Sequence, residues 1–504
     1  MTLLVGRLLA DAATVNPDGT AATLDGVEVS YRQLERQARA MTGALLARRL
    51  PPGQRVVWWC DPDLRSLAGF AAVARAGLVF APLNPAFSPD ELAAALDYLH
   101  PALVVADAAH LDAAHVHAGH LDAGHLDAAG SAGTDRPGMA VVALDQLAGG
   151  NEPREPDDPV DIDDDAPQII YLTSGTTGRP KGVVVSHRAS WLRSFPGGST
   201  FAAGLAGDGG ILVSFPLFHY GGWHYVLEAW HHRTAFHICR RFDGPSLVAA
   251  AERWRPTAMY CIPAVWNRVL AATPDGAGLE SVRHADTGTS AAPAELLERL
   301  RAAMPAATTS VLYGSSEGGH HTTLHHRDAA AHPGSVGRVA PPGVIRLADD
   351  GEILYRGPTL MDGYFERPDE TEAALAGGWY HTGDLGTMDA DGFVWITGRA
   401  KEIIRTGGES VAPVEVEQAL AGLPGVSDLA VVGVTHPDWG EVVVVALVAD
   451  GPVPDGAAVR AHLEGRLARF KHPRLVVAVP AIPRTPATGQ IQRTLLRDVV
   501  SEKL

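Results

Sequence analysis

The chain has 504 residues, of which 46% are hydrophobic and 20% are charged, and its formal net charge is −17. This length exceeds what one hydrophobic core organises, so we expect two or more domains. The acidic balance argues against nucleic acid or an anionic membrane surface as a partner. Residues 1–10 are too short an apolar run to span a bilayer, and three widely spaced cysteines fit a reducing compartment, so we expect a cytoplasmic protein.

The N-terminal part alternates between helical and strand patterns. Residues 31–46 and 64–76 have apolar residues at helical spacing, and residues 55–60 are a short β-branched and aromatic run. Farther along, three strands each precede a turn of small residues, at 258–262, 286–290 and 310–317. This pattern predicts an α/β fold with a largely parallel sheet and a ligand crevice beyond the carboxyl ends of its strands.

Residues 168–182 combine a short apolar strand with a loop of hydroxyl residues and glycines, TSGTTGRPKG. Glycines let backbone N–H groups turn toward an anion, hydroxyl groups donate hydrogen bonds, and Lys181 adds a positive charge. The spacing differs from the Walker loop, because Lys181 follows Pro180 and precedes Gly182. The pattern therefore predicts a phosphate-binding loop of another kind.

Residues 211–224 are predicted to form a buried strand that ends in a turn. The turn would expose His219, Tyr220, Trp223 and His224 beside paired glycines, which suits the wall of a small-molecule pocket. A hydrogen-bonded structural histidine is an equally good interpretation of His219 taken alone.

Two histidine-rich stretches are assigned no chemistry. Residues 110–133 repeat His-Leu-Asp-Ala in a segment of biased composition, which indicates a solvated insertion. The cluster at 320–326 has no nearby cysteine and one neighbouring carboxylate, unlike the closed tetrahedral metal sites of proteins.

The C-terminal third changes character twice. Residues 351–398 read as short strands with frequent glycines, which predicts a small β subdomain. Beyond them, helical patterns at 413–423 and 455–467 alternate with strands at 430–434 and 442–448. We therefore expect an N-terminal domain of residues 1–399 and an α+β domain of residues 400–504.

Five strings occur in order along nearly the whole chain: TSGTTGRPKG, PLFHYGG, YGSSEGG, HTGDL and GRAKEIIRTGGESVAPVEVE. In these strings the chain resembles the adenylate-forming superfamily of acyl-CoA synthetases, peptide-synthetase adenylation domains and luciferases. The resemblance implies a large N-terminal region with two mainly parallel sheets flanked by helices and a small β subdomain. It also implies a small mobile C-terminal lid, with ATP and Mg²⁺ bound between the two parts.

The resemblance also implies roles for individual residues. The phosphates of ATP would lie on Thr173, Ser174, Gly175, Thr176, Thr177, Gly178 and Lys181, with Mg²⁺ held by Thr176 and Glu317. The adenosine would lie on Gly288, Thr289, Ser290, Tyr313, Gly314, Ser316, Asp384 and Arg399, because a carboxylate suits the vicinal diol of the ribose. The substrate would contact His219, Tyr220, Trp223, His224, Gly288 and Gly318. Lys401 would be the lid hinge, and Gly407 and Gly408 would line a channel for CoA. The catalytic set would be His219, Glu317, Arg399, Lys401 and Gln490.

Gln490 marks a departure from the family pattern, because the catalytic lysine of the family would stand at this position. A neutral amide removes a full positive charge from the developing transition state, a loss of about 2 to 4 kcal/mol if nothing replaces it. Arg484 and Arg493 are candidate replacements. A milder departure is Ser316, which stands where the family has threonine and keeps the hydroxyl group.

The leading hypothesis is an ATP-dependent ligase that activates a small or aromatic carboxylate as an acyl adenylate and transfers the acyl group to CoA. Tyr220, Trp223 and His224 would narrow the pocket for such a substrate. One alternative is a ligase with another acceptor, either an amide synthetase or a diazotase that activates nitrite for an aryl amine. A further alternative is a catalytically impaired nucleotide-binding protein. The sequence is compatible with a homodimer but does not define the oligomeric state.

Overall fold

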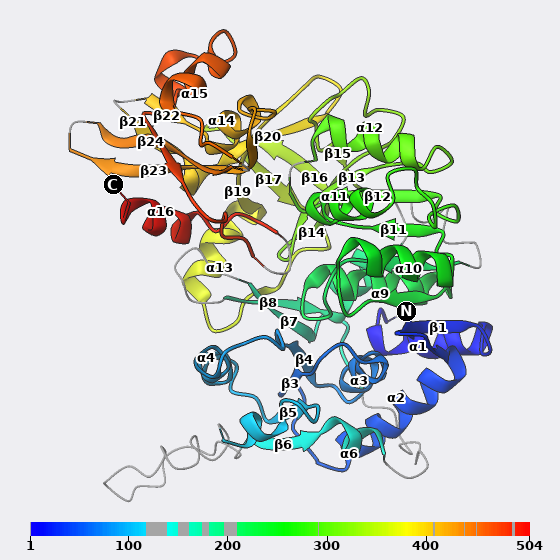
Figure 1. Cartoon of the computed structure of the whole chain (residues 1–504). Coiled ribbons are helices and arrows are strands. Elements are labelled where there is room, and N and C mark those ends of the chain that lie inside the picture. Colours follow the sequence, from blue (N-terminus) through cyan, green and yellow to red (C-terminus); the bar gives the residue numbers. More distant parts are fainter. Residues whose placement is uncertain are drawn as a thin grey trace, which may run out of the picture.

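The computed structural model describes residues 2–116, 139–149, 161–173, 181–195, 209–290, 292–406, 409–437, 439–449, 451–485 and 489–503. The fold consists of two large sheets, a small four-stranded sheet and a C-terminal α+β unit, and the strands of the two large sheets interleave along the chain (Figure 1). The α/β architecture predicted from the sequence is confirmed. No helix among the described residues is both long and apolar enough to cross a membrane.

The first large sheet has the strand order β15-β14-β13-β12-β11-β9-β10-β1-β2. Its central strands pair in parallel, and the antiparallel pairs lie at its two edges. The strands span β1 Thr20–Leu24, β2 Val27–Ser30, β9 Ile211–Val213, β10 Phe236–Ile238, β11 Ala258–Tyr260, β12 His284–Gly288, β13 Val311–Ser315, β14 Gly319–Leu324 and β15 Arg338–Val339. The parallel strands end at one edge, where ligands bind in open α/β sheets.

The second large sheet has the order β18-β8-β7-β4-β3-β5-β6. It is parallel from β7 to β6 and antiparallel at β8 and β18. Its strands span β3 Arg55–Trp59, β4 Val79–Pro82, β5 Leu103–Ala106, β6 Ala140–Ala143, β7 Pro167–Thr173, β8 Lys181–Ser186 and β18 Gly363–Tyr364. Strands β7 and β8 flank the predicted phosphate loop, and Thr173 pairs with Lys181 across them.

Helices cover both sheets and fill the space between them. Local sequence signals determine where several helices begin. Helices α2 and α4 each begin with a capping box, formed by Ser30 and Gln33 in α2 and by Ser88 and Glu91 in α4. The helices of this region are α1 Val5–Val15, α2 Tyr31–Leu46, α3 Leu64–Arg75, α4 Pro89–Leu99, α6 Leu144–Ala148, α7 His187–Ser194, α9 Tyr220–His232, α10 Gly244–Trp254, α11 Pro263–Ala272, α12 Ala294–Ala303 and α13 Pro368–Ala374. Helices α1, α3, α7 and α9 pack on one another, and one continuous core joins them to both sheets.

The prediction for residues 211–224 was right about a buried strand at its start and wrong about the exposed turn. Strand β9 ends at Val213, and Tyr220 begins helix α9 rather than standing in an exposed turn. Pro216 lacks the N–H that a continuing strand needs, and His219 caps the new helix through its side chain. The ring of Trp223 is fully buried and stacks on Phe70 at 4.2 Å between centroids, so this residue belongs to the core.

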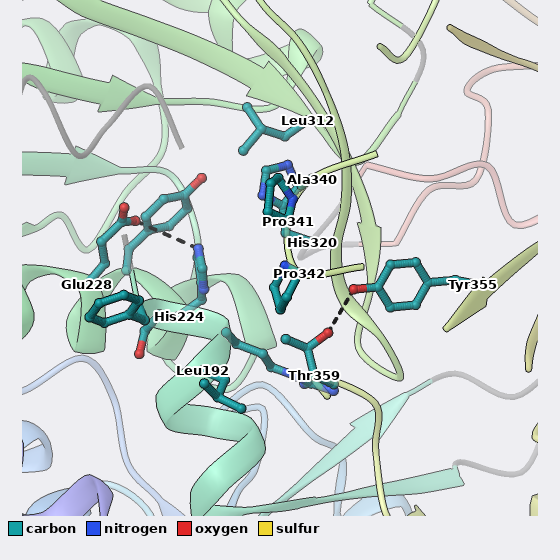
Figure 2. A pocket seen from close by; sticks show the side chains of 14 residues that line it. Leu192, His224, Glu228, Leu312, His320, Ala340, Pro341, Pro342, Tyr355 and Thr359 are labelled. Carbon is teal, nitrogen blue, oxygen red and sulfur yellow. Dashed lines mark hydrogen bonds and ion pairs between the residues drawn. The ribbon is translucent and has the colours of Figure 1, made fainter. Parts of the chain in front are cut away.

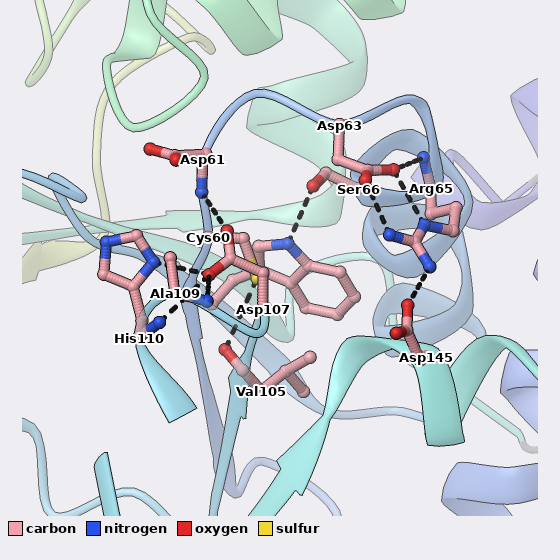
Figure 3. A network of polar contacts seen from close by, with 11 residues as sticks. Cys60, Asp61, Asp63, Arg65, Ser66, Val105, Asp107, Ala109, His110 and Asp145 are labelled. Carbon is pink, nitrogen blue, oxygen red and sulfur yellow. Dashed lines mark hydrogen bonds and ion pairs between the residues drawn. The ribbon is translucent and has the colours of Figure 1, made fainter. Parts of the chain in front are cut away.

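Polar contacts tie together the ends of β3 and β5 and helix α6 (Figure 3). Arg65 pairs with Asp63, which caps α3, and reaches Asp145 on α6. Asp107 accepts a hydrogen bond from the backbone N–H of Asp61 at 2.7 Å. Cys60 is buried beside this network, and burial raises the pKa of its thiol well above the usual range. The network therefore supports the sheet, and the thiol has no reactive character.

The small sheet has the order β16-β17-β19-β20 and is antiparallel throughout. Its strands span β16 Val344–Leu347, β17 Glu352–Arg356, β19 Tyr380–Met388 and β20 Val394–Arg399. The chain then passes through Ala400–Glu402 into the C-terminal unit, which lies beside β20 at one end of the molecule (Figure 1).

The C-terminal unit is a sheet with helices on both faces, and each face has its own apolar core. The sheet has the order β22-β21-β24-β23, with β25 added in parallel to β24. The elements are β21 Ile404–Thr406, β22 Glu409–Val411, α14 Pro413–Ala419, β23 Val426–His436, β24 Gly440–Ala449, α15 Gly456–Leu463, β25 Leu475–Ala478 and α16 Arg493–Ser501.

Candidate active site

Three predicted adenosine-binding residues form one hydrogen-bonded group, which we call the nucleotide cluster: Tyr313, Asp384 and Arg399. The hydroxyl of Tyr313 donates to Oδ2 of Asp384 at 2.7 Å, and Nε of Arg399 lies 2.9 Å from Oδ1. The register of β19 and β20 places Asp384 opposite Arg399. Burial and the Asp384 charge raise the pKa of Tyr313 well above its usual range, so its hydroxyl remains a donor.

The turn after β12 brings the predicted adenine-binding residues beside this cluster. A Cβ added at Gly288 would lie 2.0 Å from the carbonyl oxygen of Leu312, so only glycine fits between β12 and β13. Thr289 has a φ of 70°, which turns the chain sharply, and its hydroxyl lies 3.3 Å from the hydroxyl of Tyr260. The exposed residue Ser290 follows in the same turn.

A second polar group links both ends of the phosphate loop to the predicted Mg²⁺ ligand Glu317. The ammonium of Lys181 pairs with Glu370 and lies 4.6 Å from the ring centroid of Tyr364. The hydroxyl of Tyr364 donates to Oε1 of Glu317 at 2.9 Å. A carboxylate is the hard oxygen ligand that Mg²⁺ prefers, so Glu317 fits the role. The hydroxyl of Thr173 donates a hydrogen bond to the carbonyl oxygen of Lys181 at 3.4 Å, which joins the two residues that flank the phosphate loop.

Arg193, at the end of α7, fixes the loop that carries Ser316 and Glu317. Its guanidinium donates to the carbonyl oxygens of Ser316 at 2.9 Å, Glu317 at 2.9 Å and Thr359 at 2.7 Å. It also lies over the ring of Tyr220, 5.2 Å from the centroid. One buried cation therefore joins α7, α9 and the YGSSEGG loop. No sequence motif indicated this residue.

Close contacts in the YGSSEGG loop leave no room for a side chain at two of its glycines. A Cβ at Gly314 would lie 2.2 Å from the carbonyl oxygen of Gly319, and one at Gly318 would lie 2.2 Å from Cε1 of His321. The N–H of Gly318 donates to the hydroxyl of Ser315 at 3.0 Å. Glycine at these two positions therefore lets the loop pack closely against β14 and the ring of His321.

His219 lies at the start of α9. Its Nδ1 accepts a hydrogen bond from the N–H of Gly221 at 3.0 Å, which leaves Nε2 to carry the proton. The ring stacks on Phe215, and burial lowers the pKa of His219 to about 4. At neutral pH this imidazole is an uncharged hydrogen-bond donor.

A cavity runs along α9 between α7, β13, β14 and residues 340–342, and we call it the α9 cavity (Figure 2). Its wall combines apolar and aromatic residues, among them Tyr225, Leu312 and Tyr355, with polar residues that include His224, Glu228 and His320. Burial lowers the pKa of His224 to about 3, and the hydroxyl of Tyr220 lies 3.4 Å from its Nδ1. Trp223, predicted as a substrate contact, faces the core and a second hollow beside Pro216 instead.

The C-terminal unit reaches the nucleotide end of the site through a tight hairpin. Gly489 has a φ of 65° and packs against Ile262, and the next residue points its side chain into the site. There Nε2 of Gln490 donates to the carbonyl oxygen of Thr289 at 3.3 Å. The position predicted for the catalytic lysine is thus beside the turn that is predicted to bind adenine, with an amide in place of an ammonium.

The two arginines considered as replacements are engaged inside the C-terminal unit. Arg484 pairs with Asp428 at 2.7 Å and donates to the carbonyl of Gly489. Arg493 is 11% exposed and pairs with Glu402 at 2.7 Å and Glu417 at 2.6 Å. Neither guanidinium therefore replaces the missing charge in this arrangement. Lys401 lies in the 3-10 turn Ala400–Glu402, between the small sheet and the C-terminal unit.

Several predicted residues lie outside the described residues. They are Ser174, Gly175, Thr176, Thr177 and Gly178 of the phosphate loop, and Gly407 and Gly408 of the C-terminal unit. Most of the histidine-rich segment at 110–133 also lies outside them. In the second histidine cluster, His326 accepts a hydrogen bond from the N–H of Thr309, and Nε2 of His320 bonds with the carbonyl of Thr322.

The fold and the site together define an ATP-dependent adenylate-forming ligase. The sequence matches the model of the AMP-binding enzyme family over residues 9–365 and that of the AMP-binding enzyme C-terminal domain over residues 415–488. The chain belongs to this family.

Characterised relatives extend over the full chain. This chain is 31% identical over 509 residues to indoleacetate–CoA ligase of Aromatoleum aromaticum, and the aligned region covers 97% of each chain. It is 32% identical over 501 residues to a feruloyl-CoA synthase of an Amycolatopsis species, which covers 96% of both. The structure matches ATP-bound MatB from Rhodopseudomonas palustris with a TM-score of 0.88, 27% identity and full coverage of both chains.

Proposed function

We propose that this protein activates a small or aromatic carboxylic acid with MgATP and transfers the acyl group to CoA. The observation that carries the proposal is the meeting of the nucleotide cluster, the Thr289 turn and the α9 cavity at one strand edge. The CoA ligases among the relatives, two of them named for aromatic acids, support the same reaction class.

In the first step a carboxylate oxygen of the substrate attacks the α-phosphorus of ATP. A P–O bond forms, the bond to pyrophosphate breaks, and pyrophosphate leaves with both bonding electrons. The protein aligns the two reactants and stabilises negative charge. Asp384 and Tyr313 hold the ribose and adenine, Lys181 contacts phosphate oxygens, Glu317 binds the Mg²⁺ that arrives with ATP, and the neutral His219 donates a hydrogen bond.

In the second step the thiolate of CoA attacks the acyl carbon, and AMP leaves. This step needs access to the acyl carbon from the side of the C-terminal unit, where Lys401 connects the two parts of the chain. We propose that rotation about this connection, at the predicted boundary after residue 399, opens the path for CoA.

Gln490 is the residue on which the efficiency of the first step depends. Its amide keeps a hydrogen bond to Thr289 but supplies no positive charge. We therefore expect slow adenylation, and we expect Gln490→Lys to raise acid-dependent pyrophosphate release by about 30- to 900-fold, the equivalent of 2 to 4 kcal/mol.

The test measures pyrophosphate and AMP release from MgATP with a panel of carboxylic acids and with nitrite, each with and without CoA and an aryl amine. Gln492→Lys, two residues along the chain, adds the same charge as a matched control. Acid-dependent release that rises with CoA supports the proposal. Release that ignores CoA and requires an amine supports the ligase with another acceptor. A silent parent chain whose Gln490→Lys variant is active supports the impaired nucleotide-binding protein.

A further inference from the structure

The hydroxyl of Tyr98 lies between the ends of two strands of the second large sheet. Tyr98 is near the end of α4, and its hydroxyl accepts a hydrogen bond from the N–H of Gly182 at 3.2 Å. The same hydroxyl donates to the carbonyl oxygen of Phe365 at 2.6 Å. Gly182 belongs to β8, which begins at Lys181, and Phe365 directly follows β18. One side chain of α4 therefore joins segments that lie 84 and 267 residues away along the chain.

The Tyr98 hydroxyl takes the place of a main-chain hydrogen bond. The register of β8 and β18 sets Tyr364 opposite Val183, so Phe365 comes opposite Gly182. Two residues that face each other in a hydrogen-bonded antiparallel pair exchange two bonds between N–H and carbonyl groups. One of the two is present, from the N–H of Phe365 to the carbonyl oxygen of Gly182 at 2.8 Å. The other is replaced by a relay, which runs from the N–H of Gly182 through the Tyr98 hydroxyl to the carbonyl oxygen of Phe365.

Both ends of this relay are next to a residue of the candidate site. On β8 the neighbour is Lys181, and on β18 it is Tyr364, whose ring centroid lies 4.6 Å from the Lys181 ammonium. The hydroxyl of Tyr364 donates to Oε1 of Glu317 at 2.9 Å. The spacing that Tyr98 imposes between the two backbones therefore contributes to the distance between the proposed phosphate ligand and the proposed Mg²⁺ ligand.

Other contacts hold the ring of Tyr98 in place without its hydroxyl. The ring packs edge-on against that of Phe365, with 5.8 Å between centroids, and the guanidinium of Arg367 lies 5.6 Å from its centroid. The end of α4 is anchored by Arg55 of β3, which donates to two carbonyl oxygens there at 2.9 and 2.6 Å. Removal of the hydroxyl alone should therefore leave the ring in position and break only the relay.

We propose that Tyr98 is a positioning residue for the binding of MgATP. Its hydroxyl holds the backbones of β8 and β18 at the spacing in which Lys181 and Glu317 together bind the β- and γ-phosphates and their Mg²⁺. Tyr98 does not touch the reacting atoms and acts through these two residues. The proposal rests on the MgATP site of the proposed function, and it adds to that site a residue from outside all five motif strings.

The test compares the affinities of the parent chain and of Tyr98→Phe for MgATP and for AMP, by calorimetric titration at a fixed Mg²⁺ concentration. AMP lacks the β- and γ-phosphates, so its affinity reports the nucleotide cluster without Lys181 and the metal ion. We expect Tyr98→Phe to weaken MgATP binding about tenfold, the effect of one to two hydrogen bonds, and AMP binding by less than about twofold. With an acid that the protein activates, kcat/KM for ATP in pyrophosphate release should fall by the same factor as the MgATP affinity.

Tyr31→Phe is the matched control. It removes a hydroxyl that is also bonded to main-chain carbonyl oxygens, at 2.7 and 3.1 Å, in the core between α2 and α9. It should lower the stability and leave the ratio of the two affinities unchanged. Gly182→Ala reaches the relay from the other strand, since its Cβ would lie 3.2 Å from Cβ of Phe365 and 3.4 Å from Cε1 of Tyr98. It should also weaken MgATP binding more than AMP binding, so the question is decided even if Tyr98→Phe does not fold.

Two outcomes would overturn the inference while the proposed function stands. One is equal MgATP affinity of the parent chain and Tyr98→Phe, and the other is an equal loss of MgATP and AMP affinity, which would make the relay a support of the fold alone. Because the affinities are measured without an acid, a silent acid panel counts against the proposed function and not against the inference. If the parent chain binds no MgATP, both fail together.

Discussion

The two ends of the site are built differently. The nucleotide end consists of short contiguous strings whose side chains bond to one another, as Tyr313, Asp384 and Arg399 do. The α9 cavity is assembled from α7, α9, β13, β14 and the 340–342 segment, which are far apart in the sequence. The first is a set of polar contacts between strands β13, β19 and β20. The second combines apolar surface with buried histidines and a carboxylate, and we propose that it binds the acid.

Acidification should first reduce the stability of the region around the α9 cavity. Burial lowers the pKa of His219 and His320 to about 4 and that of His224 and His321 to about 3. The unfolded chain binds these protons near pH 6.5, so the stability from the neutral imidazoles is complete above pH 6.5 and is lost as the pH falls toward 4. Each contributes up to about 3 kcal/mol to this loss.

Urea unfolding at pH 7.5, 6.0 and 5.0 measures this slope. We expect the free energy of unfolding to fall steeply below pH 6.5. The variant His224→Gln should bind about one proton fewer on unfolding, which reduces the slope of this free energy against pH. The exposed His115→Gln serves as the control and should leave the slope unchanged. A parent chain with equal stability at pH 7.5 and 5.0 would contradict the prediction.

At the nucleotide end the largest effect is expected from Asp384→Ala. The change removes the acceptor of Tyr313 and the partner of Arg399, and kcat/KM for ATP should fall by about 30- to 1000-fold, or 2 to 4 kcal/mol. The control is Asp391→Ala, in the exposed turn at the far end of the same hairpin. Equal activity of the two variants would show that the nucleotide cluster does not bind ATP.

Gly288→Ala tests whether the close approach of the β12 and β13 backbones is needed for stability and for ATP binding. The added Cβ would meet the carbonyl oxygen of Leu312 at 2.0 Å, so the backbone must move at a cost of about 1 to 3 kcal/mol in stability. The measurement is thermal unfolding together with the KM for ATP. Gly451→Ala, which has no neighbour within 4 Å, should change neither.

A smaller effect is expected from Tyr364→Phe, which removes one hydrogen bond to Glu317. A hydrogen bond to a charged group contributes about 1.5 to 3 kcal/mol, and Glu317 is partly exposed, so we expect the low end and a roughly tenfold lower kcat/KM. Titration of activity with Mg²⁺ should show a weakened response. An unchanged Mg²⁺ dependence with lowered stability would assign the tyrosine to the fold alone.

Much of the nucleotide end could be predicted from the sequence. Turns after β12 and β13 need glycines at fixed places, and Asp384 and Arg399 follow from the register of one hairpin. These features depend on residues close together in the chain, so short strings specify them. The alternation of helices and strands in residues 27–108 followed from periodicity for the same reason.

The tertiary structure alone decided the rest. Strand β9 ends at Val213, and residues 220–232 form a helix that His219 caps, which turns Trp223 into the core. It also placed Glu228 in the wall of the cavity and directed Arg193 to the Ser316 and Glu317 carbonyls, contacts that span more than 120 residues of sequence. Gln490 was visible in the sequence as a departure, but its contact with Thr289 depends on how the C-terminal unit packs. Local strings specify the motifs that this chain shares with its family, whereas packing between distant elements shapes the α9 cavity.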